Sequence, residues 1–143
     1  MSGYIESFRG HVLNSQCDLM GHMNVQFYNG CISQAMATMF GAVGLRPEEM
    51  KAKKRGFAAI EQSNRYHAEL LPGDIIHMES GVLKSSSRTL TFHHRLFNSS
   101  TGKLSYEATI TAAFMDLEAR KAIPFEEEMK SNISSLTVAG GDA

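Results

Sequence analysis

The longest regular pattern in the chain lies between residues 25 and 43 and has the spacing of an α-helix. Apolar residues recur there every three or four positions and fall on one stripe of a helix. They are Val25, Tyr28, Ile32, Met36, Met39 and Val43. Further apolar residues occupy the other faces, and no Asp, Glu, Lys or Arg occurs between Asp18 and Arg46. We therefore expect a helix over 25–43 that the rest of the protein encloses on nearly every side.

After residue 57 the spacing changes to the alternation that is typical of strands. The clearest example is 104–115, where apolar side chains at even positions alternate with polar ones. Short turns rich in Ser, Gly and Pro separate the strands, which predicts an antiparallel meander. The predicted strands are 4–13, 57–71, 75–83, 88–98 and 104–115. A short helix over 124–133 and a frayed tail over 134–143 complete the prediction.

Length and composition limit the possible functions. The 143 residues suffice for one domain with a real core, and the net charge of −1 argues against nucleic acid as the main partner. The start of the chain lacks the basic and apolar regions of a signal peptide. Polar residues interrupt the apolar helix too often for a membrane span. We expect a soluble, cytoplasmic protein that does not act at a membrane.

A single carboxylate, Asp18, lies seven residues before Val25 at the start of the predicted helix. Asn24 is a suitable residue to cap that helix. The free N–H groups of a first helical turn favour an anion, and they can also polarise a bound carbonyl oxygen. A carboxylate beside such donors makes a workable hydrolytic site. In a partly buried groove we expect the pKa of Asp18 to be raised.

The run Asp18-Leu19-Met20-Gly21-His22-Met23-Asn24, leading into a helix, resembles the loop of hotdog-fold acyl-CoA thioesterases. The 4-hydroxybenzoyl-CoA thioesterase-like branch is the most similar group. The resemblance covers roughly residues 4–125, including Asp116, Arg120, Lys121 and Pro124 after the last strand. It implies an α+β hotdog domain over residues 1–143, in which an antiparallel sheet wraps around one long helix. It also implies a homo-oligomer, either a dimer or a dimer of dimers, with active sites at the subunit interface.

The resemblance implies a role for each residue of the loop. Asp18 would act as nucleophile or general base, and a backbone amide near Asn24 and Val25 would polarise the thioester carbonyl. Gly21 would supply a backbone geometry that any side chain would block. His22 would hold the loop in place. The substrate would be a small or medium acyl-CoA, so coenzyme A enters only as part of the substrate and no cofactor is expected. The residues expected to line its pocket are Phe27, Tyr28, Met39 and Tyr66.

Other polar residues are weaker candidates for substrate contacts. Glu61, Ser63 and Asn64 lie in the predicted strand 57–71, which helps to form the subunit interface and the substrate groove in hotdog dimers. One of them is a candidate to contact substrate across the dimer, although a solvated strand face explains half of them. Arg88, the serine turn at 85–87 and the basic residues 53–55 are candidates for the coenzyme A phosphates. Taken singly, each basic residue is typical of a solvated surface.

The cysteines and histidines predict no metal site. Cys17 and Cys31 have neither the spacing of metal ligands nor that of a disulfide framework. Cys31 is best explained as a small core residue of the helix. His93 and His94 are adjacent on a strand, so their side chains point to opposite faces.

Two other functions remain open at the level of sequence. Some hotdog proteins are dehydratases or hydratases that use a His–Asp pair, and His22 lies close to Asp18. Others bind acyl-CoA without hydrolysing it. The three possibilities differ in their products: a free thiol, a dehydrated thioester, or an unchanged ligand.

Overall fold

Alternating apolar residues on consecutive strands build one curled antiparallel sheet. The structure is a computed structural model that describes residues 3–138. Its main strands are, in spatial order, β1 (Ile5–His11), β3 (Ile75–Ser85), β4 (Thr89–Asn98), β5 (Leu104–Asp116) and β2 (Arg55–Tyr66). A further short strand, β6 (Lys121–Ala122), pairs with the end of β5. The expected meander is therefore present as β3, β4 and β5.

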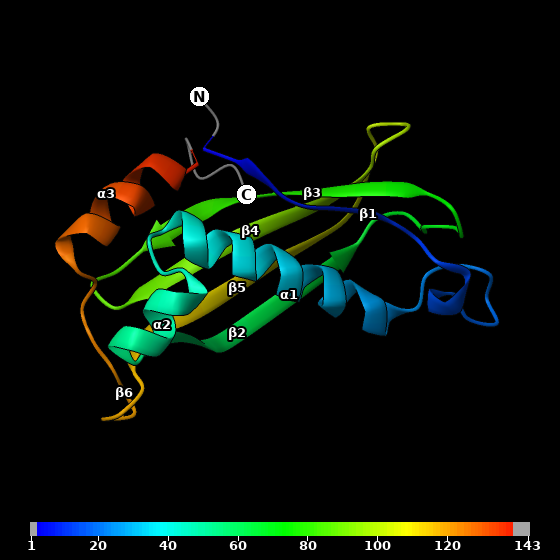
Figure 1. Cartoon of the computed structure of the whole chain (residues 1–143). Coiled ribbons are helices and arrows are strands. Elements are labelled where there is room, and N and C mark those ends of the chain that lie inside the picture. Colours follow the sequence, from blue (N-terminus) through cyan, green and yellow to red (C-terminus); the bar gives the residue numbers. More distant parts are fainter. Residues whose placement is uncertain (1–2, 139–143) are drawn as a thin grey trace.

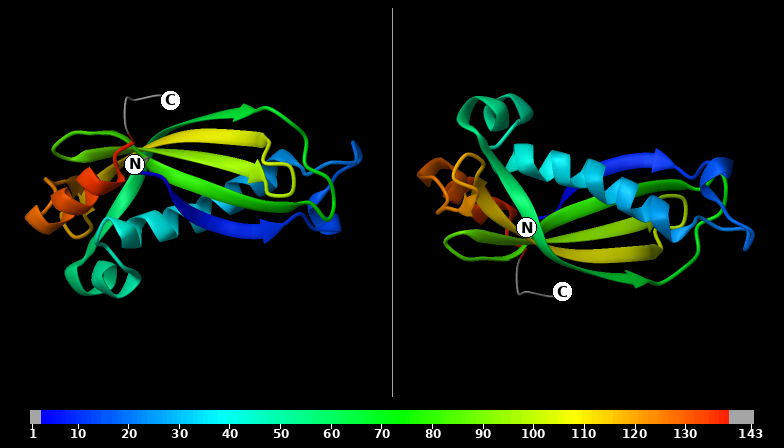
Figure 2. Two further views of the ribbon diagram at one scale, coloured as in Figure 1. Left: turned by 90° about the horizontal axis from the view of Figure 1, so that it is seen from above. Right: turned by 90° about the horizontal axis from the view of Figure 1, so that it is seen from below.

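The inner face of this sheet carries the core. On β5 the even-numbered residues Tyr106, Ala108, Ile110 and Ala112 are buried, as the alternation predicts. The helix α1 (Val25–Ala42) lies against this face along the length of the sheet (Figures 1 and 2). One cluster of buried apolar side chains packs around the first half of α1, and a second packs around its end. The core between helix and sheet therefore consists of two clusters.

The burial of α1 differs from the expectation that it would be enclosed. Its buried residues form one stripe: Tyr28, Cys31, Ile32, Ala35 and Met39. The opposite stripe is exposed: Val25, Gln26, Asn29, Gly30, Ser33, Gln34, Ala37 and Thr38. The expectation of burial on nearly every side is wrong, because most of the residues of this second stripe are uncharged yet polar or small. The sheet covers one side of the helix only.

Two shorter helices close the end of the sheet that lies away from Asp18 (Figure 1). They are α2 (Pro47–Lys53) and α3 (Glu127–Leu136). α3 extends beyond the predicted end at residue 133, and the Val138 amide donates to Val82 O of β3 at 2.9 Å. The expected frayed tail over 134–143 therefore does not begin at 134, because Ile133 and Leu136 are buried in the core. Residues 139–143 lie outside the described part of the chain.

Strand β2 forms an edge of the sheet and is unusually exposed. Within residues 3–138 it pairs with β5 only, and every residue from 58 to 66 is exposed. A register shift after Ala59 fixes which residues face α1. Gln62 Nε2 donates to Asn29 Oδ1 of α1 at 3.1 Å, so Gln62 and the even positions after it lie on the helix side. Ser63 and the odd positions lie on the outer side of the sheet.

Candidate active site

A tight loop places Asp18 beside the start of α1. The Asp18 amide donates to His22 O at 3.2 Å, and the Gly21 amide donates to Asp18 O at 2.9 Å. Gly21 has a φ of +85°, in the left-handed region that favours glycine. Cys17 and Met23 form an antiparallel bridge that closes the loop, and the Met23 side chain is buried. The loop is therefore anchored at its base while its tip stays open to solvent.

Two donors orient the Asp18 carboxylate. Asn24 Nδ2 donates to Oδ2 at 2.8 Å, and the Met20 amide donates to Oδ1 at 2.9 Å. These bonds to the charged form, with Asn24 contributing most, hold the pKa of Asp18 below its ordinary value. The expected rise in pKa is wrong, because the side chain is hydrogen-bonded and partly exposed. Asp18 is ionised at neutral pH, as a base or nucleophile must be.

Asn24 serves the helix and the carboxylate together. Its Oδ1 accepts a hydrogen bond from the Gln26 amide at 3.1 Å, which confirms the predicted N-cap. Its own amide donates to Gln16 O at 2.8 Å and is therefore occupied. The Val25 amide, the first of α1, donates to no group within residues 3–138. Of the two amides considered from sequence, only that of Val25 is available to polarise a ligand oxygen.

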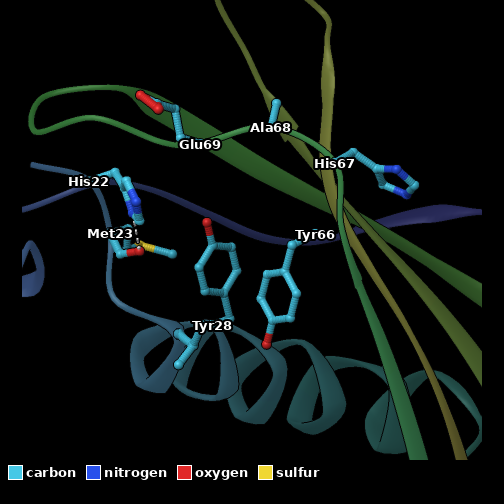
Figure 3. A pocket seen from close by; sticks show the side chains of 8 residues that line it. His22, Met23, Tyr28, Tyr66, His67, Ala68 and Glu69 are labelled. Atoms are coloured by element: carbon cyan, nitrogen blue, oxygen red, sulfur yellow. Dashed lines mark hydrogen bonds between the residues drawn. The ribbon is translucent and has the colours of Figure 1, made fainter. Parts of the chain in front are cut away.

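A pocket of about 260 Å³ has Val25 among its lining residues, and Figure 3 shows seven of the other residues that line it. It lies between the Asp18 loop, the first turns of α1 and the segment that follows β2. Tyr28 packs against Tyr66 and Tyr106, with ring centroids 5.1 Å and 4.7 Å away. The lining residues are His22, Met23, Val25, Tyr28, Tyr66, His67, Ala68 and Glu69. No Lys or Arg is among them.

Of the four residues expected to line the pocket, Tyr28 and Tyr66 do so. Phe27 packs against the first apolar cluster, and Met39 is fully buried in the second, further along α1. His22 lines the pocket, but its Nδ1 lies 3.3 Å from Met23 O and no hydrogen bond joins the ring to Asp18. The structure thus places His22 as a wall of the pocket.

Three of the substrate-binding candidates lie elsewhere on this chain. Ser63 is paired with Thr109 and Glu61 with Thr111, on the side of the sheet that faces away from α1. Arg88 lies in the turn between β3 and β4, and its carbonyl accepts from the Phe114 amide near the other end of the sheet. These positions keep all three residues away from this chain's own pocket. The sequence did not show this, because the spacing of residues reveals neither the register nor the direction of the strands.

The basic residues 53–55 lie at that same distant end. Lys53 is 3.6 Å from Glu126, Lys54 is 3.1 Å from Glu118, and Arg55 is 3.6 Å from Asp116. Each is therefore already beside a carboxylate of its own chain.

Comparison with known protein families settles the family. A family model for the thioesterase-like superfamily matches residues 12–133. The chain belongs to the thioesterase-like superfamily. The matched span runs from the end of β1 into α3 and includes the whole Asp18 loop, so the family resemblance seen in the sequence is confirmed.

Solved structures confirm the hotdog α+β fold. A hypothetical protein from Staphylococcus aureus, solved in complex with CoA, is 18% identical with a TM-score of 0.85, covering 95% of this chain and 84% of that one. A 1,4-dihydroxy-2-naphthoyl-CoA thioesterase from Synechocystis is 13% identical with a TM-score of 0.79, covering 93% and 97%. The probable thioesterase YbaW from Escherichia coli is 17% identical with a TM-score of 0.73, covering 94% and 96%. At these identities the likeness is one of fold.

Three negative findings accompany these matches. No curated protein sequence matches the chain significantly. No helix in residues 3–138 is both long and apolar enough to cross a bilayer. Within the same span, no cluster of His, Cys, Asp and Glu side chains has the arrangement of a metal site.

Sequence reasoning missed His67, Ala68 and Glu69, which line the pocket directly after β2. They belong to no motif, and they reach the site because the Met23 amide donates to Leu70 O at 2.8 Å. Only knowledge that the end of β2 lies beside the Asp18 loop could have selected them.

Proposed function

We propose that this protein hydrolyses a small or medium acyl-CoA thioester to a free acid and CoA. One observation carries the proposal: Asn24 and Met20 hold the ionised Asp18 carboxylate, and the next residue after Asn24, Val25, has a free amide and lines a pocket. Family membership and the known neighbours support the same reaction class.

In the proposed reaction, the Val25 amide and the positive end of the α1 dipole stabilise the charge that develops on the thioester oxygen. Asp18 either deprotonates a water that attacks the carbonyl carbon, or attacks that carbon itself to give an anhydride that water then opens. Both routes expel the CoA thiolate, which takes up a proton, and both need Asp18 ionised. Coenzyme A enters only as part of the substrate, and the proposal requires no cofactor or metal.

The proposal includes a homodimer formed through β2. This strand is the exposed edge of the sheet, and Ile60 at its centre is 63% exposed. Unpaired edges are normally covered or paired, because they otherwise aggregate. Antiparallel pairing of two β2 strands would bring Arg55, at the start of one, beside His67, after the end of the other. The partner's basic residues 53–55 would then be the ones to approach the pocket, whereas its Glu61 and Ser63 would lie near the centre of the interface, on the face away from α1.

Light scattering tests the assembly. We expect a mass of at least twice the 15.8 kDa of the chain at micromolar concentration, and a shift toward monomer for Ile60→Lys. A monomeric wild-type protein would contradict the dimer.

Two unpaired cysteines, Cys17 and Cys31, suit a reducing compartment, so the proposal places the activity in the cytoplasm.

A panel of acyl-CoAs tests the reaction itself. Released thiol is measured with a chromogenic thiol reagent, and mass spectrometry of the remaining thioester detects any loss of water. We expect thiol release. Loss of water with the thioester intact would favour a dehydratase, and binding with no turnover would favour an acyl-CoA-binding protein. Either result would contradict hydrolysis.

A further inference from the structure

The hydroxyl of Tyr28 differs from that of its neighbour Tyr106. Both rings are buried, at 4% and 0% exposure. The Tyr106 hydroxyl donates to Asn64 Oδ1 at 2.6 Å, whereas the Tyr28 hydroxyl has no hydrogen-bond partner within residues 3–138. Figure 3 shows the Tyr28 hydroxyl directed to the side of the pocket where His22 and Glu69 lie. The Tyr28 hydroxyl is therefore unpaired and, unlike its ring, open at the pocket wall, where it is available to a ligand.

Glu69 adds a free negative charge to the same pocket. Its side chain is exposed and forms no ion pair or hydrogen bond with residues 3–138, although it lines the pocket together with Tyr28. No Lys or Arg lines the pocket. Glu69 is therefore the one residue among Asp, Glu, Lys and Arg that lines the pocket.

The acyl group is the part of the substrate that fits here. A pocket of about 260 Å³ is at the small end for ligand sites and cannot hold the nucleotide of CoA. The phosphates of CoA also favour cationic partners, and no Lys or Arg lines this pocket. With the thioester carbonyl at Val25, the CoA arm must point to solvent and the acyl chain into the pocket, toward Tyr28 and Glu69.

We propose that Tyr28 and Glu69 determine substrate specificity: together they select acyl groups that end in a hydroxyl and reject acyl groups that end in a carboxylate. This inference rests on the proposed function. A terminal hydroxyl can donate to the Glu69 carboxylate and exchange a hydrogen bond with the Tyr28 hydroxyl. A terminal carboxylate would meet the Glu69 charge with no cation to offset it.

The test uses matched trios of acyl-CoAs that have the same acyl length and end in a methyl, a hydroxymethyl or a carboxylate group. The measured quantity is kcat/KM for each member. We expect wild type to prefer the hydroxylated member and to disfavour the carboxylate. Glu69→Gln should raise the carboxylate-to-methyl ratio on the order of tenfold, the size expected for like charges at close range in a partly solvated groove. Glu69→Lys should raise it further, and added salt should weaken both effects.

Tyr28→Phe should lower the hydroxyl-to-methyl ratio by roughly 3- to 10-fold, because it removes one hydrogen bond to the ligand. Its thermal stability should stay close to wild type, since the lost hydroxyl has no partner among residues 3–138. Tyr106→Phe is the matched control: it breaks the bond to Asn64, lowers stability and leaves the ratios unchanged. Glu127→Gln, on the distant α3, controls for loss of a surface carboxylate.

The outcomes separate the inference from the proposed function. Thioester hydrolysis with ratios that Glu69→Gln and Tyr28→Phe leave unchanged would overturn the inference and leave the function standing. If no thioester is hydrolysed, the function is contradicted. In that case the inference is tested by calorimetric affinities of wild type and Glu69→Gln for the same trios. A rise on the order of tenfold in the carboxylate-to-methyl ratio of affinities would support the inference, and an unchanged ratio would overturn it.

Discussion

Protonation of His94 should destabilise the fold, and the size of the effect follows from how far burial lowers the pKa of its ring. His94 on β4 is fully buried between the sheet and α1. Its Nδ1 lies 2.6 Å from Ser80 Oγ and its Nε2 lies 3.1 Å from Met36 Sδ. Burial lowers the pKa of His94 from 6.5 to about 3, because the charged ring would lose its hydration.

The sign of the effect follows from this difference in pKa. Between pH 6.5 and about 3 the unfolded chain binds a proton at His94 that the folded protein does not. Stability is therefore unaffected above pH 6.5 and falls as the pH is lowered through this range. At pH 5, which is 1.5 units below the unfolded value, His94 alone should reduce the free energy of unfolding by about 2 kcal/mol.

Urea unfolding followed by circular dichroism, at fixed protein concentration, measures this loss at pH 7 and at pH 5. We expect the loss in His94→Gln to be smaller than in wild type by about 2 kcal/mol, because glutamine keeps a polar side chain but does not titrate. The control is His11→Gln, at the exposed end of β1. The assignment to the buried ring would be refuted if wild type and His94→Gln lost the same free energy of unfolding between pH 7 and pH 5. It would also be refuted if His11→Gln reduced that loss as much as His94→Gln does.

Two further substitutions test the loop and the sheet. Asn24→Ala should cost about 1 kcal/mol through the lost helix cap, and it should raise the pKa of Asp18, so that the acid limb of the kcat/KM profile moves to higher pH; an unmoved limb would contradict the role of Asn24. Gly81→Ala would place a Cβ 2.6 Å from Val138 Cγ1 and push the C-terminal segment off β3. We expect it to lower the free energy of unfolding by about 1–3 kcal/mol, and wild-type stability in urea would show that this contact is not required.

The sequence was sufficient to predict the sheet and the loop, because both depend on local patterns. Alternation over Leu104–Phe114 predicts the face of β5 that meets α1, and Asn24, a capping residue directly before the apolar pattern, predicts the helix start. The extent of burial of α1 was harder. The absence of charge predicts enclosure, but Gln26, Ser33 and Gln34 are exposed, because uncharged polar side chains are hydrated by water as charged ones are.

The rest of the candidate site depends on contacts between distant segments. The register shift after Ala59 decides that Ser63 faces away from α1, and no local pattern reveals it. Glu69 joins the pocket because its segment is bonded to the Asp18 loop. The sequence also predicts the wrong direction for the pKa of Asp18. Burial alone would raise this pKa, but the hydrogen bonds from Asn24 and Met20 lower it by more.

The rate of thiol release by Asp18→Asn is the most direct test of the account. The substitution keeps the shape of the side chain and removes its charge. The account predicts a fall in kcat of at least about 10²-fold on the best acyl-CoA, the range of a positioned base, with KM changed only a few-fold. Glu127→Gln, which removes an exposed carboxylate on α3 at the far end of the sheet, should keep wild-type activity. Near-full activity in Asp18→Asn would contradict the central claim, and His22 would then be the next residue to substitute.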